Sequence, residues 1–241
     1  MLKRFSVFFS LLFVAGGHCY AQDEQLWLDF QLSYPFANRY LLENTTSYQT
    51  LLNEDGKWRN ISMSPTFEYV LLTRLELTAE IPFGYTKQTE GVSSWEISPI
   101  VGGRFHITQN KKIDTRFLLR YQVRAFHEIE AEDWEVSNRT RLKGEIYWSI
   151  NGPNLFTDKL WYFFADYEEF LVFDHQVDER YANRRRGRIG IGYRLSYAHR
   201  FDLSFTRQSS RNEIEGAFIT NDNVIQFKYK LFLNPARPTT P

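Results

Sequence analysis

Arginine recurs at alternate positions in the segment RRRGRIGIGYR, residues 184–194. In a β-strand, side chains two positions apart point to the same face, so this segment gathers guanidinium groups on one side. The residues on that face are Arg184, Arg186, Arg188 and Arg194, with Gly190 and Gly192 between them. Such a row can bind an anionic solute or set the ion selectivity of a narrow pore. It can equally fill and rigidify the interior of a small barrel.

Carboxylates that suit these arginines lie in the preceding segment, WYFFADYEEF. If the connection between the two segments turns symmetrically about Val177, Asp166 faces Arg188 and Glu168 faces Arg186. Opposite charges attract when they stand directly opposed on two antiparallel strands. We therefore predict these two cross-strand pairs, and we expect the glycines to leave space for large neighbouring side chains to cross the interior.

Catalysis would require a nucleophile or an activated water within hydrogen-bond reach of a base. Ser98 shares a strand face with His106 but lies eight residues away, about 26 Å in an extended strand. Asp114 is placed to pair with His106 across the turn TQNKK, yet no nucleophile is evident beside them. No catalytic residue is therefore assigned, and a barrel-type hydrolase remains an alternative.

Acidic side chains gather in the segment HEIEAED, residues 127–133, which we expect to form a loop. Oxygen ligands suit Ca²⁺ or Mg²⁺, but the spacing does not match an EF-hand. We predict no metal site and no cofactor.

The elements that must position these residues are strands, because apolar and polar residues alternate in segment after segment. Turn-rich pieces such as NEDGK, TEGVSS and TQNKK separate the segments. No later apolar run approaches the length of a membrane-spanning helix. The segments expected to form strands are residues 25–33, 38–51, 57–71, 73–86, 92–107, 112–126, 133–150, 158–173, 183–196, 199–209 and 222–233.

Alternation of this kind fits two environments. A soluble sandwich or lipocalin-like barrel keeps apolar side chains inside, whereas a transmembrane barrel turns them outward to lipid and encloses a polar lumen. Several segments keep their phase beyond the roughly 9–11 residues that cross a bilayer, whereas soluble strands usually run about 5–6 residues. We therefore predict an all-β fold: a closed, antiparallel, up-and-down transmembrane β-barrel.

The placement of tryptophan also favours a membrane. Trp134 and Trp148 lie on one face, fourteen positions apart, which is roughly 35 Å along the membrane normal for a tilted strand. The two interfacial aromatic girdles of a barrel are separated by about that distance. The residues expected at these interfaces are Trp58, Trp95, Trp134, Trp148 and Trp161.

In this orientation, ionised side chains point into the lumen and apolar side chains meet lipid. The stretch RLELTAEIPFGY shows the division, because Glu76 and Glu80 alternate with Leu77, Ile81 and Phe83. The charged residues expected to line the lumen are Glu80, Glu96, Arg104, Arg116, Arg120, Arg139, Arg141, Glu145, Asp166, Glu168, Arg186, Arg188 and Arg194.

The connections alternate in length, as they do in outer-membrane barrels with short periplasmic turns and long external loops. We count eleven strand segments, but a bacterial barrel with both chain ends in the periplasm has an even number of strands. We therefore expect about twelve strands, with ten as the alternative. Pro65, Pro82 and Pro99 fall inside strand segments. Since each removes a ladder hydrogen bond, we expect bulges there, or positions beyond the membrane edge.

The first residues, MLKRFSVFFSLLFVAGGHCYAQ, have the features of a secretory signal peptide. Lys3 and Arg4 form a basic start, a short apolar core follows, and small residues precede the expected cleavage site after Ala21. The expected division of the chain is a signal peptide at 1–21, a barrel at 22–233 and a C-terminal tail at 234–241.

Cleavage would remove Cys19, the single cysteine. The mature chain then has neither disulfides nor thiolate metal sites. The full sequence has 29 basic and 29 acidic residues, so loss of Lys3 and Arg4 leaves a net charge of about −2. That balance does not indicate a nucleic-acid partner.

Three pieces of the sequence carry a resemblance to a known family: the opening LWLDFQLSYPF, the segment WYFFADYEEF, and RRRGRIGIGYRLS followed by a final alternating strand. Together they resemble the outer-membrane family catalogued as domain of unknown function 2490. The resemblance implies an outer-membrane β-barrel and brings no established activity, so it transfers no catalytic residue. One departure is the end NPARPTTP, where many outer-membrane barrels finish on an aromatic residue.

These observations predict a barrel in the outer membrane of a Gram-negative bacterium. We expect outer-membrane lipid, lipopolysaccharide and the barrel insertion machinery as its partners. The first functional hypothesis is a porin-like narrow pore or passive solute channel with a charged lumen. The alternative is a structural or surface-interaction barrel that acts through its external loops.

Overall fold

A computed structural model describes residues 23–52, 58–87, 93–109, 111–130, 133–172, 183–211 and 219–234. The expected signal peptide and nearly all of the expected C-terminal tail lie outside these ranges. The described residues form thirteen strands in one sheet. None of them forms a helix long and apolar enough to cross a membrane.

The strands follow the alternating segments of the sequence closely. Their bounds are β1 (Asp23–Phe36), β2 (Tyr40–Leu51), β3 (Arg59–Leu72), β4 (Leu75–Glu80), β5 (Phe83–Lys87), β6 (Ser93–Ile97), β7 (Ile100–Thr108), β8 (Ile113–Glu128), β9 (Glu135–Ser149), β10 (Leu160–Val172), β11 (Asn183–Arg194), β12 (His199–Arg211) and β13 (Ile219–Phe232).

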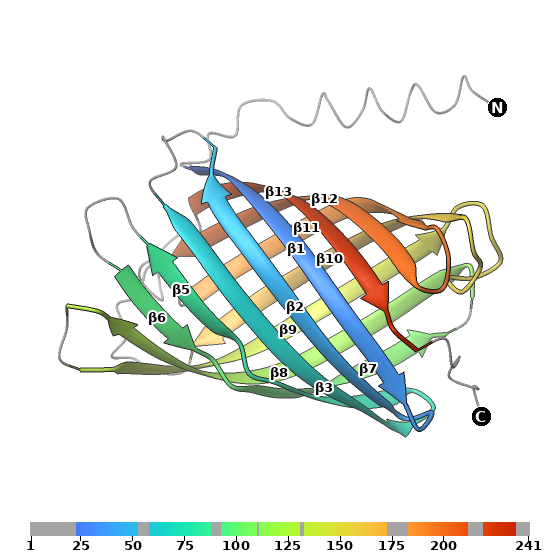
Figure 1. Cartoon of the computed structure of the whole chain (residues 1–241), viewed down its shortest axis with the longest axis horizontal. Coiled ribbons are helices and arrows are strands. Elements are labelled where there is room, and N and C mark those ends of the chain that lie inside the picture. The colour runs from blue at the N-terminus through green and yellow to red at the C-terminus, as the bar shows by residue number, and fades with distance from the viewer. Residues whose placement is uncertain are drawn as a thin grey trace.

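The sheet closes on itself as a barrel, which confirms the predicted fold class (Figure 1). Two pairs of short strands each occupy the place of one long strand. β4 and β5 both pair with β3, and β6 and β7 both pair with β8. The wall therefore has eleven strand positions, which match the eleven segments counted in the sequence.

The expectation of an even count is wrong, because β1 and β13 close the barrel as a parallel pair. All other pairings are antiparallel. With an odd number of alternating strands, the first and last strands must run in the same direction. The described chain therefore begins at one end of the barrel and finishes at the other.

Two of the three prolines account for the interrupted strands. Pro82 stands between β4 and β5, and Pro99 stands between β6 and β7. Pro65 lies inside β3, opposite Asn44 of β2. A proline has no N–H to donate, but its carbonyl oxygen still accepts from the next strand. These bonds run from Ile81 N to Pro65 O at 3.0 Å, from Ser98 N to Pro82 O at 2.9 Å and from Val123 N to Pro99 O at 3.0 Å.

The two faces of the wall carry opposite kinds of side chain, in the orientation that the sequence predicts. Phe83, Phe117 and Phe227 are exposed on the outer surface, whereas Glu145 is buried inside. A soluble barrel would place these groups the other way round. An apolar exterior around a charged interior requires lipid outside, so the fold is that of a membrane-spanning barrel.

The two ends of the barrel differ in their connections. The long-loop end, as we name it, carries the connections 52–58, 88–92, 129–134, 173–182 and 212–218, and β1 begins there. The short-turn end carries 37–39, 73–74, 109–112, 150–159 and 195–198, and β13 finishes there. The segment NGPNLFTDK within 150–159 is the one long connection on that side.

Candidate functional site: the charged barrel interior

The hairpin of β10 and β11 has the register that a symmetric turn predicts. Asp166 stands directly opposite Arg188, and Glu168 stands opposite Arg186. The Asp166 Oδ2 to Arg188 Nη2 distance is 2.6 Å, and the Glu168 Oε2 to Arg186 Nη1 distance is 3.9 Å. Both predicted pairs are confirmed, and the first is the tighter one.

Glu168 is the centre of a larger group of charges. Its Oε1 accepts from Arg120 Nη2 at 2.5 Å and from Arg141 Nε at 2.9 Å, and only 2% of the residue is exposed. Arg120 and Arg141 face each other directly across β8 and β9. Like charges in that position repel, so the carboxylate between them is what allows both to be buried.

Three guanidinium groups also surround one buried ring. The distance from the guanidinium carbon Cζ to the ring centroid of Phe170 is 4.9 Å for Arg139, 4.8 Å for Arg141 and 5.5 Å for Arg186. Such cation–π contacts orient guanidinium groups without neutralising them. We refer to Arg139, Arg141 and Arg186 as the arginine cluster.

Neutral amides hold the arginine cluster in place. Arg139 Nε donates to Gln122 Oε1 at 2.8 Å, and Arg186 Nε donates to Gln208 Oε1 at 2.9 Å. Within the described ranges, Glu168 is the one carboxylate that lies within 4 Å of the cluster. Arg141 and Arg186 share this carboxylate with Arg120, and Arg139 pairs with no carboxylate among the described residues, so the cluster keeps a local surplus of positive charge. In the β9–β10 register, Arg139 stands opposite Val172, which is the last residue of β10. The surplus of positive charge therefore lies toward the long-loop end.

The other charged residues predicted for the lumen are on the inner face, where most of them form ion pairs, and Lys143 also lies 3.7 Å from Asp166. None of the ion pairs given next includes a residue of the arginine cluster. The pairs are Arg104 with Glu68 at 3.0 Å and with Glu76 at 2.7 Å, Arg124 with Glu96 at 2.9 Å, Lys143 with Glu145 at 2.7 Å, Arg116 with Asp114 at 3.1 Å and Arg194 with Asp158 at 3.6 Å. Glu80 stands on the same face, opposite Ile100 of β7.

A second polar network spans the parallel seam, and the sequence did not predict it. Asp29 of β1 lies opposite Lys228 of β13, with 3.4 Å between Oδ2 and Nζ. It also accepts from Ser47 Oγ and from Gln226 Nε2, each at 2.6 Å. Alternation along the sequence is enough to place the side chain of Asp29 on the inner face. Its partners, however, depend on which strands meet where the barrel closes.

The predicted pairing of His106 with Asp114 is wrong. His106 Nε2 lies 3.1 Å from Glu76 Oε1, and Asp114 pairs with Arg116 instead. The register of β7 and β8 places His106 opposite Arg116, and the register of β4 and β7 places Glu76 opposite Arg104, diagonal to His106. Among the described residues, no group of three or more His, Cys, Asp or Glu side chains is placed to hold a metal ion.

The tryptophans expected at the interfaces lie near the ends of strands. Trp95 and Trp134 are exposed near the long-loop end, and Trp148 and Trp161 are exposed near the short-turn end. Trp58 directly precedes β3 and is partly buried. Other rings pack against three of them. The distance between ring centroids is 4.9 Å for Trp95 and Tyr85, 4.9 Å for Trp134 and His127, and 4.7 Å for Trp161 and Tyr193.

Fold and interior together define a membrane-spanning β-barrel with a densely packed, charged interior. The family model described as "Protein of unknown function (DUF2490)" matches residues 24–216, and the chain belongs to this family.

Solved structures support the barrel fold. LpxR from Salmonella typhimurium matches with a TM-score of 0.54 and 10% sequence identity, over 84% of this chain and 87% of that chain. At that identity the likeness concerns the fold alone. Comparison with curated proteins finds no match.

Proposed function

We propose that the protein is a Gram-negative outer-membrane barrel that forms a narrow, anion-selective passage. The observation that carries the proposal is the arginine cluster, in which Arg141 and Arg186 pair with Glu168 while Arg139 contacts the neutral Gln122 and the ring of Phe170. A surplus of fixed positive charge in a low-dielectric passage concentrates anions and repels cations. The cluster would therefore act as the selecting element for a small anionic solute.

Placement in the outer membrane is supported by the expected signal peptide together with strands that cross a bilayer. In this placement the long-loop end faces outward and the short-turn end faces the periplasm. Outer-membrane lipid covers the apolar wall, lipopolysaccharide surrounds the long-loop end, and the barrel insertion machinery assembles the protein.

A structural barrel is the second candidate function. It is supported by the pairing of most other interior charges and by the burial of polar residues such as Thr206 and Ser149 inside the wall. An interior filled in this way stiffens a barrel without needing to conduct.

Conductance in planar lipid bilayers separates the two candidates. Under a KCl gradient, the reversal potential of the wild-type protein should show anion selectivity, and Arg139→Gln should reduce that selectivity. The matched control is Arg185→Gln, because Arg185 lies on the outer face of β11 and pairs there with Glu169. Electrical silence, or equal selectivity in all three proteins, would reject the pore and leave the structural barrel.

A further inference from the structure

A groove opens on the outer wall of the barrel near the short-turn end. It has a volume of about 340 Å³ and runs across β2, β3 and β4. The residues that line it are Tyr40, Phe67, Tyr69, Leu77, Thr78 and Ala79. Ala79 pairs with Phe67, and Leu77 pairs with both Tyr69 and Gly103. The groove therefore exists because small residues stand among large ones on a surface that faces lipid.

One side of the groove is a row of stacked aromatic rings. The centroid of Tyr40 lies 5.3 Å from that of Phe36, 5.2 Å from that of Tyr69 and 5.8 Å from that of Phe67. Rings packed in this way form a rigid apolar wall, and tyrosine hydroxyl groups suit the boundary between hydrocarbon and headgroups. A wall of this kind can hold an extended hydrocarbon chain.

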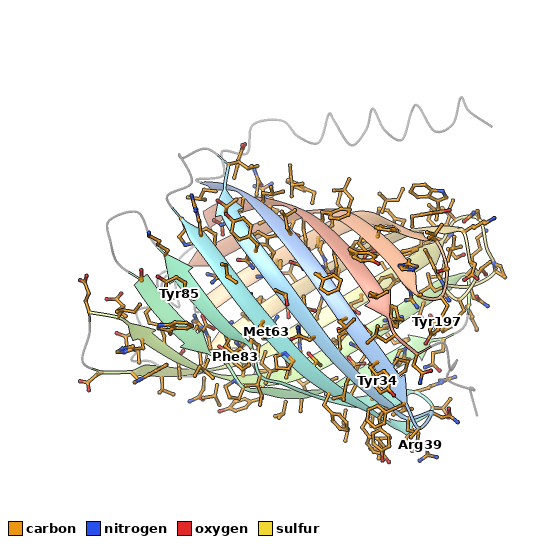
Figure 2. The ribbon with its side chains drawn as sticks, in the orientation of Figure 1. Tyr34, Arg39, Met63, Phe83, Tyr85 and Tyr197 are labelled. Atoms are coloured by element: carbon orange, nitrogen blue, oxygen red, sulfur yellow. The ribbon has the colours of Figure 1, made fainter. Side chains whose placement is uncertain are left out.

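Two arginines stand at the end of the groove. Arg39 directly precedes Tyr40, and Arg74 lies in the turn between β3 and β4. Both are exposed. Hydrogen bonds from Val70 N to Arg39 O at 2.8 Å and from His106 N to Arg74 O at 2.9 Å fix both turns against the wall. Figure 2 shows Arg39 at the same end of the barrel as Tyr34, with Tyr85 at the opposite end.

The charges of these two arginines are available to a ligand. In the part of the chain that the structure describes, neither guanidinium group forms an ion pair with a carboxylate. Guanidinium groups bind phosphate through charge-assisted, often bidentate hydrogen bonds. Two such groups above an apolar groove match a molecule with a phosphate at one end and a hydrocarbon chain at the other.

We propose that this groove is a binding site for one glycerophospholipid, with an acyl chain between the aromatic wall and Ala79 and with its phosphate on Arg39 and Arg74. The site lies at the short-turn end, where the periplasmic leaflet supplies phospholipid. It depends on the membrane placement proposed above but not on conduction. A silent barrel would bind the lipid equally well.

Native mass spectrometry of the purified full-length protein, released from detergent micelles, tests the site. The probes are phosphatidylglycerol and the uncharged diacylglycerol with the same chains. The wild-type protein should retain one phosphatidylglycerol. Its affinity for diacylglycerol should be lower by a factor of about ten, since the charge-assisted hydrogen bonds to the phosphate are lost. Heat-modifiable gel migration checks that each variant has folded.

Two variants address the two halves of the site, each with a matched control. Ala79→Leu fills the groove, and its control is Ala165→Leu on the outer face of β10, where Ala165 stands opposite the exposed Ile189. The double variant Arg39→Gln with Arg74→Gln removes the phosphate contacts, and its control is Arg185→Gln. Retention should fall about tenfold in both test variants and stay unchanged in the controls. Equal retention in all proteins, or undiminished retention in the double arginine variant, would overturn the proposal. If Ala79→Leu does not fold, the arginine variant decides alone.

Discussion

The hydroxyl group of Tyr162 on β10 donates a hydrogen bond to Asp202 on β12, across the strand β11 that lies between them. This reach is possible because β11 carries glycine where the ring passes. A Cβ added at Gly192 would collide with the ring of Tyr162, and one added at Gly190 would collide with the ring of Phe164. The glycines therefore leave room for aromatic side chains to cross the interior, as expected from the sequence.

Gly190→Ala should lower the free energy of unfolding by about 1–3 kcal/mol, the usual cost of overpacking. The added methyl group would lie 2.7 Å from the backbone carbonyl oxygen of Leu203, which cannot easily move, and against the ring of Phe164. Gly187→Ala is the control, because a Cβ at Gly187 meets nothing within 4 Å. Urea titration of the barrel in lipid vesicles measures both. Equal losses in the two variants would show that the rings do not depend on Gly190.

Tyr162→Phe should cost about 1.5–3 kcal/mol, the range for hydrogen bonds to charged groups. The substitution takes one donor from Asp202, which keeps Lys230 at 2.7 Å. Tyr167→Phe on the same strand provides the comparison, because Tyr167 is exposed on the outer face. The same urea titration applies, and a loss for Tyr167→Phe as large as that for Tyr162→Phe would contradict the assigned role.

Asp166→Asn should cost about 3–5 kcal/mol, because it leaves Arg188 and Lys143, which point into the barrel, without the buried carboxylate that pairs with both. The neighbouring pair of Glu169 with Arg185 has a similar distance, 3.0 Å, but lies on the outer face. Glu169→Gln should therefore cost about 1 kcal/mol or less. A double-mutant cycle on each pair isolates the two coupling energies. Similar values for both pairs would mean that the interior is far more hydrated than the burial of Asp166 indicates.

Alternation alone was enough to predict which face each strand residue occupies. Glu145 and Trp148 point to opposite sides of the wall because three positions separate them, and no tertiary contact is needed to know it. The register of β10 and β11 was also predictable, since one connection joins them and a symmetric turn sets the pairing of Asp166 with Arg188.

What could not be predicted were relationships that local sequence does not determine. The contact of Asp29 with Lys228 joins the first and last strands, so it depends on the number of strands in the whole barrel. The contact of His106 with Glu76 depends on the register between β4 and β7, in which Glu76 stands opposite Arg104 and diagonal to His106. A rule of even strand number could not anticipate the first, and regular alternation could not anticipate the second.

Single-tryptophan variants test whether the barrel lies across the bilayer as its surface indicates. Trp134 and Trp148 share the outer face of the strand region around β9, and roughly 35 Å along the membrane normal separates them. In variants that retain only one of them, fluorescence should be quenched more by lipids brominated near the headgroup than by lipids brominated near the chain ends. A tryptophan introduced as Leu142→Trp, on the same face midway between them, should show the reverse order because it lies at the bilayer centre. Deep quenching of Trp134 or Trp148, or no quenching at Leu142→Trp, would show that lipid does not surround this part of the wall.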